Sequence, residues 1–208
     1  MSRSCRFGPL LVEFDDRVLT PRAWTFQQSE WAVELAGAEP GPILELCAGA
    51  GQIGLAAAVL AGLDLVQVEA DPVAASYARS NAARAGWSAR VEVRNVRLEE
   101  ALQPQERFGL IIADPPYLAS ADIDRWPEDP PMAIDGGTDG LDLVRACLQL
   151  AARHLTQSGR LLLQIAGPSQ AQHITGLLAA TPGWELSCGQ PRVIDDERAI
   201  LLISRMPS

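Results

Sequence analysis

The sequence predicts an α/β fold, with a mostly parallel, seven-stranded sheet that is covered by helices and ends in an antiparallel C-terminal hairpin. Short apolar segments alternate with longer segments of helical character between residues 43 and 180. Glycine or proline lies at most of the junctions between them. After residue 180, two apolar segments follow each other with no convincing helix between them, and this predicts the hairpin.

Local patterns predict the individual elements. Strands are expected where short apolar runs occur, at residues 43–47, 65–69, 91–93, 108–113, 160–165, 184–188 and 199–204. Helices are expected at residues 27–36, 52–61, 72–85, 141–155 and 169–180. Asp71 suits the N-cap of the third helix because Pro72 follows it. The pair Ser158-Gly159 predicts a turn before the fifth strand.

The N-terminal region has its own pattern. Residues 10–14 and 17–19 flank two aspartates, Asp15 and Asp16, and predict a short hairpin with a polar turn. The run Pro40-Gly41-Pro42 is expected to interrupt the chain before the alternation begins.

Composition limits the partners and the location. The chain has 208 residues, a net charge of −9 and no lysine, which disfavours nucleic acid as a partner without excluding it. No apolar run reaches the roughly 20 residues of a membrane helix, and the N-terminus does not resemble a secretory signal. The cysteines are far apart, which predicts reduced thiols rather than disulfides or a zinc site. We therefore expect no membrane association and a cytoplasmic location.

A glycine-rich turn follows the first expected strand. Gly49, Gly51 and Gly54 have the G-x-G-x-x-G spacing of dinucleotide-binding turns, which lets backbone approach a ligand closely. Glu69 ends the next strand, where an acid can bind ribose hydroxyls. Both nicotinamide dinucleotides and S-adenosylmethionine fit this pattern.

Glu45 favours one of these two cofactors. An acid just before the glycines is unfavourable beside a pyrophosphate but suits the ammonium and sulfonium of S-adenosylmethionine. We therefore expect Glu45 near the methionine end of that cofactor and Glu69 at its ribose. The alternative is a structural role, in which the Glu45 carboxylate caps the next helix.

A second motif follows the fourth expected strand. Asp114-Pro115-Pro116-Tyr117 has two prolines that stiffen the backbone and leave the carbonyls of Asp114 and Pro115 free to accept hydrogen bonds. Tyr117 offers a flat face for stacking. This arrangement suits an incoming amino or amide nitrogen.

Together the two motifs resemble class I S-adenosylmethionine-dependent methyltransferases with an [Asn/Asp]-Pro-Pro-Tyr motif. Three stretches, residues 18–25, 46–51 and 131–141, are similar to the "V-L-I-P-R-P-x-T-E", "L-C-T-G-S-G" and "P-x-x-A-L-x-G-G-x-D-G-L" segments of the protein-(glutamine-N5) methyltransferases that modify release factors. The resemblance implies a Rossmann-like methyltransferase fold, S-adenosylmethionine as cofactor, S-adenosylhomocysteine as product and a protein glutamine as acceptor. Some short members need a small protein partner.

The resemblance and the local chemistry together assign the site residues. We expect cofactor contacts from Glu45, Cys47, Ala48, Gly49, Gly51, Glu69, Ala70, Asn95, Val96 and Asp114. We expect the acceptor to bind Asp114, Pro115, Pro116 and Tyr117, of which Asp114, Pro115 and Tyr117 act in catalysis. No metal is expected, because the glycines among Asp135, Asp139 and Asp142 suggest a loop folded over the site. Residues 1–40 are expected to pack on the cofactor site, and residues 41–208 to form the methyltransferase domain.

Three departures from the family pattern keep alternatives open. Phe26 replaces a glutamate, and Asn95-Val96 replaces the Gly-Asp whose acid reads adenine, so the Asn95 side chain or a backbone group must do so here. Asp114 replaces asparagine, and an ionised carboxylate only accepts hydrogen bonds. The acceptor is therefore a glutamine amide or, alternatively, a nucleobase amine or a small-molecule amine or amide. The rivals from other classes are an NAD(P)-dependent oxidoreductase and a catalytically inactive binding subunit.

Overall fold

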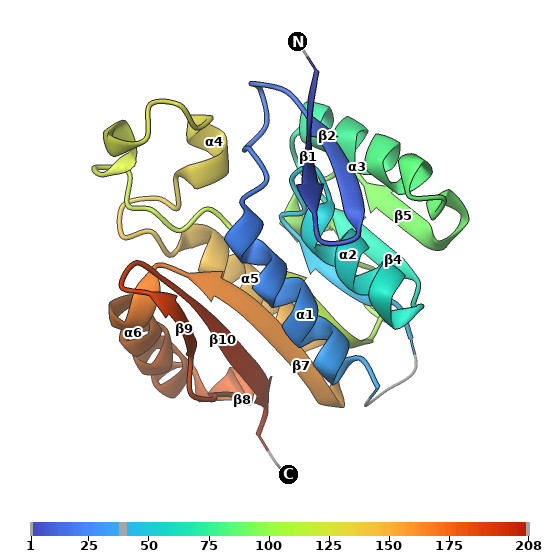
Figure 1. The fold of residues 1–208 in the computed structure, drawn as a ribbon. Helices are drawn as coiled ribbons and strands as arrows, with labels where there is room; N and C mark the ends of the chain where they lie inside the picture. Colours follow the sequence, from blue (N-terminus) through green and yellow to red (C-terminus); the bar gives the residue numbers. More distant parts are fainter. Residues whose placement is uncertain (1, 38–40, 207–208) are drawn as a thin grey trace.

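The computed structural model describes residues 2–37 and 41–206, and within them a central eight-stranded sheet carries the fold (Figure 1). Seven of its strands lie in the order β5-β4-β3-β6-β7-β10-β8, and β9 pairs with β10. The strands are β1 (Arg3–Phe7), β2 (Leu10–Phe14), β3 (Ile43–Leu46), β4 (Leu65–Val68), β5 (Val91–Arg94), β6 (Phe108–Ala113), β7 (Leu155–Ile165), β8 (Leu186–Cys188), β9 (Arg192–Asp195) and β10 (Arg198–Arg205). The α-helices are α1 (Phe26–Leu35), α2 (Gln52–Ala61), α3 (Pro72–Arg84), α4 (Pro131–Ile134), α5 (Asp142–His154) and α6 (Gly167–Ala180).

The predicted sheet is confirmed. Strands β3 to β7 pair in parallel, whereas β10 runs antiparallel to β7, β8 and β9. All seven expected strands form, and β9 is an additional strand that the sequence analysis did not predict. The carboxyl ends of the parallel strands therefore meet at one edge, where ligands bind in open α/β sheets.

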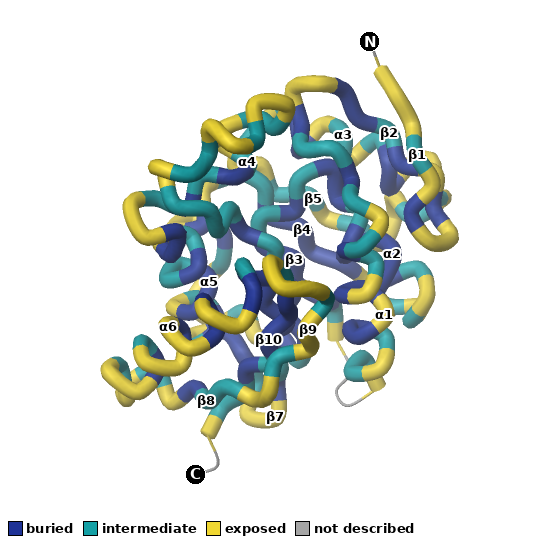
Figure 2. Tube along the Cα trace, turned by 60° about the vertical axis from the view of Figure 1, so that its left-hand side comes forward, coloured by how far each residue is buried: buried dark blue, intermediate teal, exposed yellow. Residues whose placement is uncertain are grey.

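Two hydrophobic clusters lie on opposite faces of the sheet. One joins α1, α2 and α3 to residues such as Ile43 and Ile112, and the other joins α5 and α6 to residues such as Leu44 and Ile111. The alternation follows from the period of two in a strand. Figure 2 shows the buried trace concentrated along the strands between these helices. Because helices bury both faces of the sheet, its strands appear in the sequence as nearly continuous apolar runs.

The N-terminal hairpin forms from other residues than expected. β1 pairs with β2 in antiparallel register, and Gly8, with a φ of +53°, lies in the turn between them. The expected pairing of residues 10–14 with 17–19 is wrong because Asp15 closes a turn of its own, in which its carbonyl accepts from the Val18 N–H at 3.1 Å. Residues 17–19 then leave the hairpin and reach the cavity described below.

Element boundaries agree with the local signals in most places. Asp71 caps α3, with its side chain accepting from the Val73 N–H at 2.8 Å. The turn expected at Ser158-Gly159 is wrong, because β7 already begins at Leu155 and continues through both residues. A register shift opposite them, between Phe108 and Leu110, accommodates this longer strand.

Two further expectations concern the break before the main domain and membrane-spanning helices. The predicted break at Pro40 and the domain boundary after it fall on residues 38–40, outside the described residues. Within the part of the chain that is described, no helix is long and apolar enough to cross a membrane.

Candidate functional site

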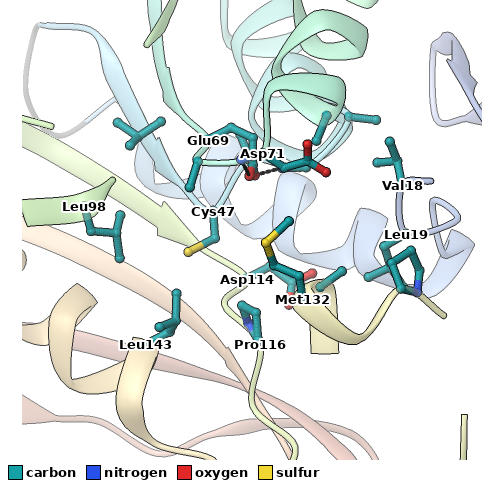
Figure 3. A pocket seen from close by; sticks show the side chains of 18 of the residues that line it. Val18, Leu19, Cys47, Glu69, Asp71, Leu98, Asp114, Pro116, Met132 and Leu143 are labelled. Carbon is teal, nitrogen blue, oxygen red and sulfur yellow. Dashed lines mark hydrogen bonds between the residues drawn. The ribbon is translucent and has the colours of Figure 1, made fainter. Parts of the chain in front are cut away.

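A cavity of about 450 Å³ lies at the carboxyl ends of the parallel strands. Figure 3 shows Glu69 and Asp71 on one side of it and Asp114, Pro116 and Met132 on another. The lining residues come from the glycine turn, the ends of β4, β5 and β6, the segment before α1, and α4 with its flanks. The volume lies within the range of roughly 300–1,000 Å³ that is typical of small-molecule sites.

The glycine turn forms one wall of the cavity. Cys47, Gly49 and Gly51 all have positive φ, at 57°, 57° and 82°, and α2 begins directly afterwards. Gly49 faces open space and lines the cavity, so its backbone conformation, and not a lack of room, favours glycine there. Gly51 lies behind the wall, where a Cβ atom would come within 2.7 Å of the Gln67 side chain. Cys47 and Ala48 also line the cavity.

Glu69 reaches the cavity from the end of β4. Its carboxylate accepts from the Gly49 N–H at 2.7 Å and from the Asp71 N–H at 2.8 Å, which joins the glycine turn to the start of α3. Burial raises the pKa of this carboxyl, and the two backbone N–H groups partly oppose the rise. A carboxylate has about four acceptor positions, so Glu69 keeps capacity for ligand hydroxyls. Ala70 lines the cavity next to it.

The structure does not bring Glu45 to the cavity, which corrects its expected position. The side chain is buried beneath the turn, where it accepts from the Gly54 N–H at 2.8 Å and from Gln67 Nε2 at 2.6 Å. A Cβ atom at Gly54 would lie 2.4 Å from Glu45 Oε2, so this third glycine makes room for the carboxyl. Burial raises the pKa of Glu45 to about 7. The alternative reading of Glu45, a structural carboxyl under the start of α2, matches this arrangement.

Of the two residues that follow β5, only Val96 lines the cavity. The Asn95 side chain instead donates to the backbone carbonyls of Glu69 at 2.8 Å and Ala70 at 3.0 Å. Asn95 therefore holds the end of β4 in place, and its amide does not face the cavity. Backbone groups next to Val96 and Leu98 remain as candidates for reading an adenine ring.

Asp114 lies directly after β6 and lines the cavity. Within residues 2–37 and 41–206 no group donates a hydrogen bond to its carboxylate, and burial alone raises its pKa to about 7. Pro116 also lines the cavity, whereas Pro115 is buried and Tyr117 lies outside the lining. The pKa of Tyr117 lies well above its usual value, chiefly because of burial. An unpaired acceptor thus faces the cavity from the second sequence motif.

Residues 114–120, here called the motif loop, are held by a second loop. Leu118 N–H donates to Ile134 O at 3.1 Å, and Gly136 N–H donates to Leu118 O at 2.8 Å. At Gly140, with a φ of +73°, a Cβ atom would lie 2.5 Å from Tyr117 O. Gln170 Nε2 on α6 also donates to Tyr117 O, at 3.1 Å. The glycines of residues 131–141 therefore allow this close backbone contact with the motif loop.

Sequence reasoning from the individual residues missed the cover of the cavity. Arg17, Val18 and Leu19 line it from the N-terminal segment, and Met132 and Leu143 line it from α4 and α5. A sequence signal for this cover was present, because two of the three family-like stretches, residues 18–25 and 131–141, contain or adjoin residues that line the cavity. Asp135 also lines the cavity and accepts from Ser120 Oγ, so the acidic loop does fold over the site.

Comparison with known proteins gives one family profile and several named methyltransferases as matches. The profile of a family described as "Conserved hypothetical protein 95" matches residues 27–126. A "Release factor glutamine methyltransferase" of Mycolicibacterium smegmatis is 35% identical over 159 residues, covering 74% of this chain and 56% of that protein. A "Ribosomal protein uL3 glutamine methyltransferase" of Burkholderia pseudomallei is 31% identical over 167 residues, covering 73% of this chain and 54% of that protein. The chain thus spans little more than half the length of these relatives.

Solved structures match over almost the whole chain. A ribosomal protein L11 methylase from Lactobacillus delbrueckii superposes with a TM-score of 0.68 at 17% identity, covering 91% of this chain and 82% of that chain. A human methyltransferase 10 domain-containing protein superposes with a TM-score of 0.70 at 14% identity, covering 96% and 90% of the two chains. These matches confirm the predicted Rossmann-like methyltransferase fold.

Proposed function

We propose that this chain, a homologue of the release-factor and uL3 glutamine methyltransferases that shares the Rossmann-like methyltransferase fold, binds S-adenosylmethionine and methylates a side-chain amide nitrogen of a protein glutamine. The observation that carries the proposal is the cavity itself, which is lined both by the glycine turn and by Asp114, a carboxyl that receives no hydrogen bond from the described residues. Because the chain matches only part of its relatives' length, their activity is proposed here for the region it shares with them.

The residues around the cavity fit S-adenosylmethionine. Gly49 leaves open space for the methionine part, and Glu69 keeps acceptor positions for the ribose hydroxyls. Val96 and Leu98 offer apolar surface to an adenine ring. When bound, the cofactor supplies an electrophilic methyl group on a sulfonium, and S-adenosylhomocysteine is the product.

The charge of the lining favours this cofactor over a nicotinamide dinucleotide. Carboxylates line the cavity at Glu69, Asp71, Glu99, Asp114 and Asp135. The arginines that line it are partly neutralised, since Arg17 pairs with Asp15 at 2.5 Å and Arg97 lies 3.4 Å from Glu99. A pyrophosphate would meet like charges here, whereas a cationic cofactor meets opposite ones. Glu45 does not contribute to this preference, because it lies behind the turn.

The chain's own residues act by positioning the acceptor. Asp114 accepts an N–H of the amide, and the Pro115 carbonyl is a second candidate acceptor, so that the nitrogen lone pair faces the methyl donor. The proton that the nitrogen loses on methylation passes to the Asp114 carboxylate. Tyr117 packs beside the acceptor. Most of the rate enhancement comes from holding two reactants in line in one site. Asp114, Pro115 and Tyr117 are the proposed catalytic residues, and Pro116 completes the acceptor site.

The acidic composition favours a protein acceptor over nucleic acid, because polyanions are usually held by basic surfaces. A nucleobase amine and a small-molecule amine or amide are the alternative acceptors. A small protein partner and a cytoplasmic location remain predictions.

Two measurements test the proposal. Isothermal titration should show binding of S-adenosylmethionine and S-adenosylhomocysteine, and binding of NADH instead would contradict the cofactor assignment. Labelled methyl transfer into fractionated cell extract should then place the label in protein. Label in nucleic acid would contradict the proposed acceptor, and cofactor binding with no transfer to any fraction would indicate an inactive binding subunit.

A further inference from the structure

Arg198 lies at the edge of the sheet that carries the motif loop. β10 is antiparallel to β7, so its first residue lies near the carboxyl ends of β6 and β7. The register pairs Ala199 with Ile165, and Ala113, the residue before Asp114, pairs with Leu163. The turn before Arg198 packs against the start of α6, where a Cβ atom at Gly167 would lie 2.7 Å from Asp196 O. The backbone of Arg198 therefore lies at nearly the same height along the strands as Asp114. β7 separates β10, which carries Arg198, from β6, which precedes Asp114.

The Arg198 side chain stacks on Trp24. The guanidinium carbon lies 4.7 Å from the centre of the Trp24 ring. Trp24 precedes Gln28 by four residues, about one helical turn, and Gln28 Nε2 donates to Ala113 O at 3.1 Å and to Leu162 O at 3.0 Å. Gln28 therefore lies over the end of β6, and Trp24 lies about one turn before it in the chain, next to the residues that line the cavity but not among them. The charge of Arg198 also acts on Tyr117, where it opposes the rise in the pKa of the phenol that burial causes.

The hydrogen-bonding capacity of Arg198 is largely unused. Its only ion pair in the described part of the chain is a 3.4 Å contact with Asp195, and no hydrogen bond from its guanidinium is found there. Arg22, by contrast, donates twice to Asp129. A guanidinium has five N–H donors, and this one is only 29% exposed. No ion pair joins Arg198 to Asp114 within the described residues, so each keeps its capacity for a ligand.

A primary carboxamide requires both kinds of partner. Its NH₂ group donates and its carbonyl oxygen accepts, whereas an ionised Asp114 only accepts. We infer that Arg198, held against Trp24, donates to the carbonyl oxygen of the acceptor carboxamide while Asp114 accepts from its nitrogen. This inference rests on the proposed glutamine methylation and adds Arg198 as its specificity-determining residue. The positive charge beside the acceptor nitrogen also disfavours an alkyl ammonium substrate.

The test uses the full chain, labelled S-adenosylmethionine and purified release factor as the probe. Arg198→Met should lower kcat/KM by about 10- to 100-fold, the effect of losing a charged hydrogen bond, and leave cofactor affinity unchanged. Arg198→Lys should recover part of the loss because it keeps a donor and the charge. Arg192→Met is the matched control, since Arg192 lies on β9 of the same hairpin and its guanidinium also stacks on a tryptophan, Trp31, at 3.9 Å. This control should retain wild-type kcat/KM.

A second comparison separates substrate binding from a structural role. An amide at position 114 can donate as well as accept, so Asp114→Asn should supply a donor for the carbonyl oxygen. The loss caused by Arg198→Met should therefore be clearly smaller in the Asp114→Asn background. A release factor with lysine at the methylated position should be labelled more readily by Arg198→Met than by the wild type.

A failure of the role of Arg198 can be distinguished from a failure of the proposed glutamine methylation. Wild-type kcat/KM in Arg198→Met, or an equal loss in both backgrounds, would overturn the role of Arg198 while the proposed function stands. A parallel loss of cofactor affinity would show that Arg198 supports the whole site instead. A wild-type enzyme that labels the lysine-substituted release factor, or an RNA, but not the glutamine would overturn the proposed acceptor and this inference together.

Discussion

Arg22 and Asp129, 107 residues apart in sequence, join the two segments that cover the cavity. Arg22 Nη2 donates to both carboxylate oxygens of Asp129, at 2.6 and 2.7 Å. The Asp129 side chain is only 8% exposed and that of Arg22 is 35% exposed, so the pair is partly shielded from water. Val18 and Met132 line the cavity from the two joined segments. The ion pair therefore holds the cover of the proposed cofactor site together.

Breaking this pair should weaken cofactor binding. In Asp129→Asn, Arg22 loses a charged partner, and we expect a loss of about 1–3 kcal/mol in the free energy of unfolding. The dissociation constant for S-adenosylmethionine, measured by titration calorimetry, should rise because residues 17–19 and 130–135 lose their connection. Asp64→Asn is the control, since the Arg90–Asp64 pair is more exposed, at 40% and 62%. It should change neither quantity. Unchanged affinity in Asp129→Asn would contradict the role of the pair.

Glu45→Gln tests whether Glu45 is structural. The folded-state pKa of about 7 lies above the ordinary value, so the folded protein holds this proton more tightly than the unfolded chain. The stability linked to this proton is therefore present below the unfolded pKa and lost as pH rises through about 7. The free energy of unfolding of the wild type should fall between about pH 5 and pH 8, and that of Glu45→Gln should fall less steeply.

The same variant should keep its affinity for S-adenosylmethionine, because Glu45 lies behind the glycine turn. A folded Glu45→Gln protein that no longer binds the cofactor would restore the expectation from sequence, in which Glu45 contacts its positive end.

The ionisation of Asp114 should appear in the pH dependence of methyl transfer. With a pKa of about 7, its carboxyl becomes an acceptor-only group as pH rises through neutrality. The rate of transfer to a glutamine acceptor should therefore rise across this range and level off above it. Asp114→Asn has no such ionisation, so its profile should lack this step. Identical profiles for the two proteins would remove Asp114 ionisation from the mechanism.

Gly140→Ala should disturb the motif loop. A side chain there combines a φ of +73° with a Cβ atom 2.5 Å from Tyr117 O, which predicts a loss of stability of about 1–3 kcal/mol. We expect kcat to fall more than cofactor affinity, because the strain acts on Tyr117 and not on the glycine turn. Gly183→Ala is the control, since no atom lies within 4 Å of its Cβ position. Equal effects of the two substitutions on kcat would contradict this account.

Local signals predicted most of the sheet and most helix ends. The cap at Asp71 and the end of α2 before Gly62 depend on neighbouring residues, so the sequence alone was sufficient. The N-terminal hairpin was mispredicted because two strands compete for Leu10–Phe14, and the tight turn at Gly8 favours β1. β9 was missed because its residues are largely exposed and β10 pairs with it from outside the parallel core.

The site residues were predicted less completely than the strands and helices. The edge of the sheet and its motifs follow from strand order, and Glu69, Gly49 and Asp114, which the motifs singled out, all line the cavity there. The direction of a side chain at the end of a strand, however, does not follow from the order of the strands in the sheet. Glu45 turned beneath α2 to meet Gly54, and Asn95 turned toward two backbone carbonyls. No sequence pattern singles out Arg198, since only the register of β10 brings it to this edge.

Mapping the transferred methyl group decides whether this chain methylates a glutamine amide. The purified chain would be incubated with isotopically labelled S-adenosylmethionine and with release factor and uL3, and the products digested and sequenced by mass spectrometry. We predict one labelled methyl group on the side-chain amide of a glutamine, with transfer strongly reduced in Asp114→Ala. Label on a lysine or on co-purifying nucleic acid, or undiminished transfer in Asp114→Ala, would contradict the account.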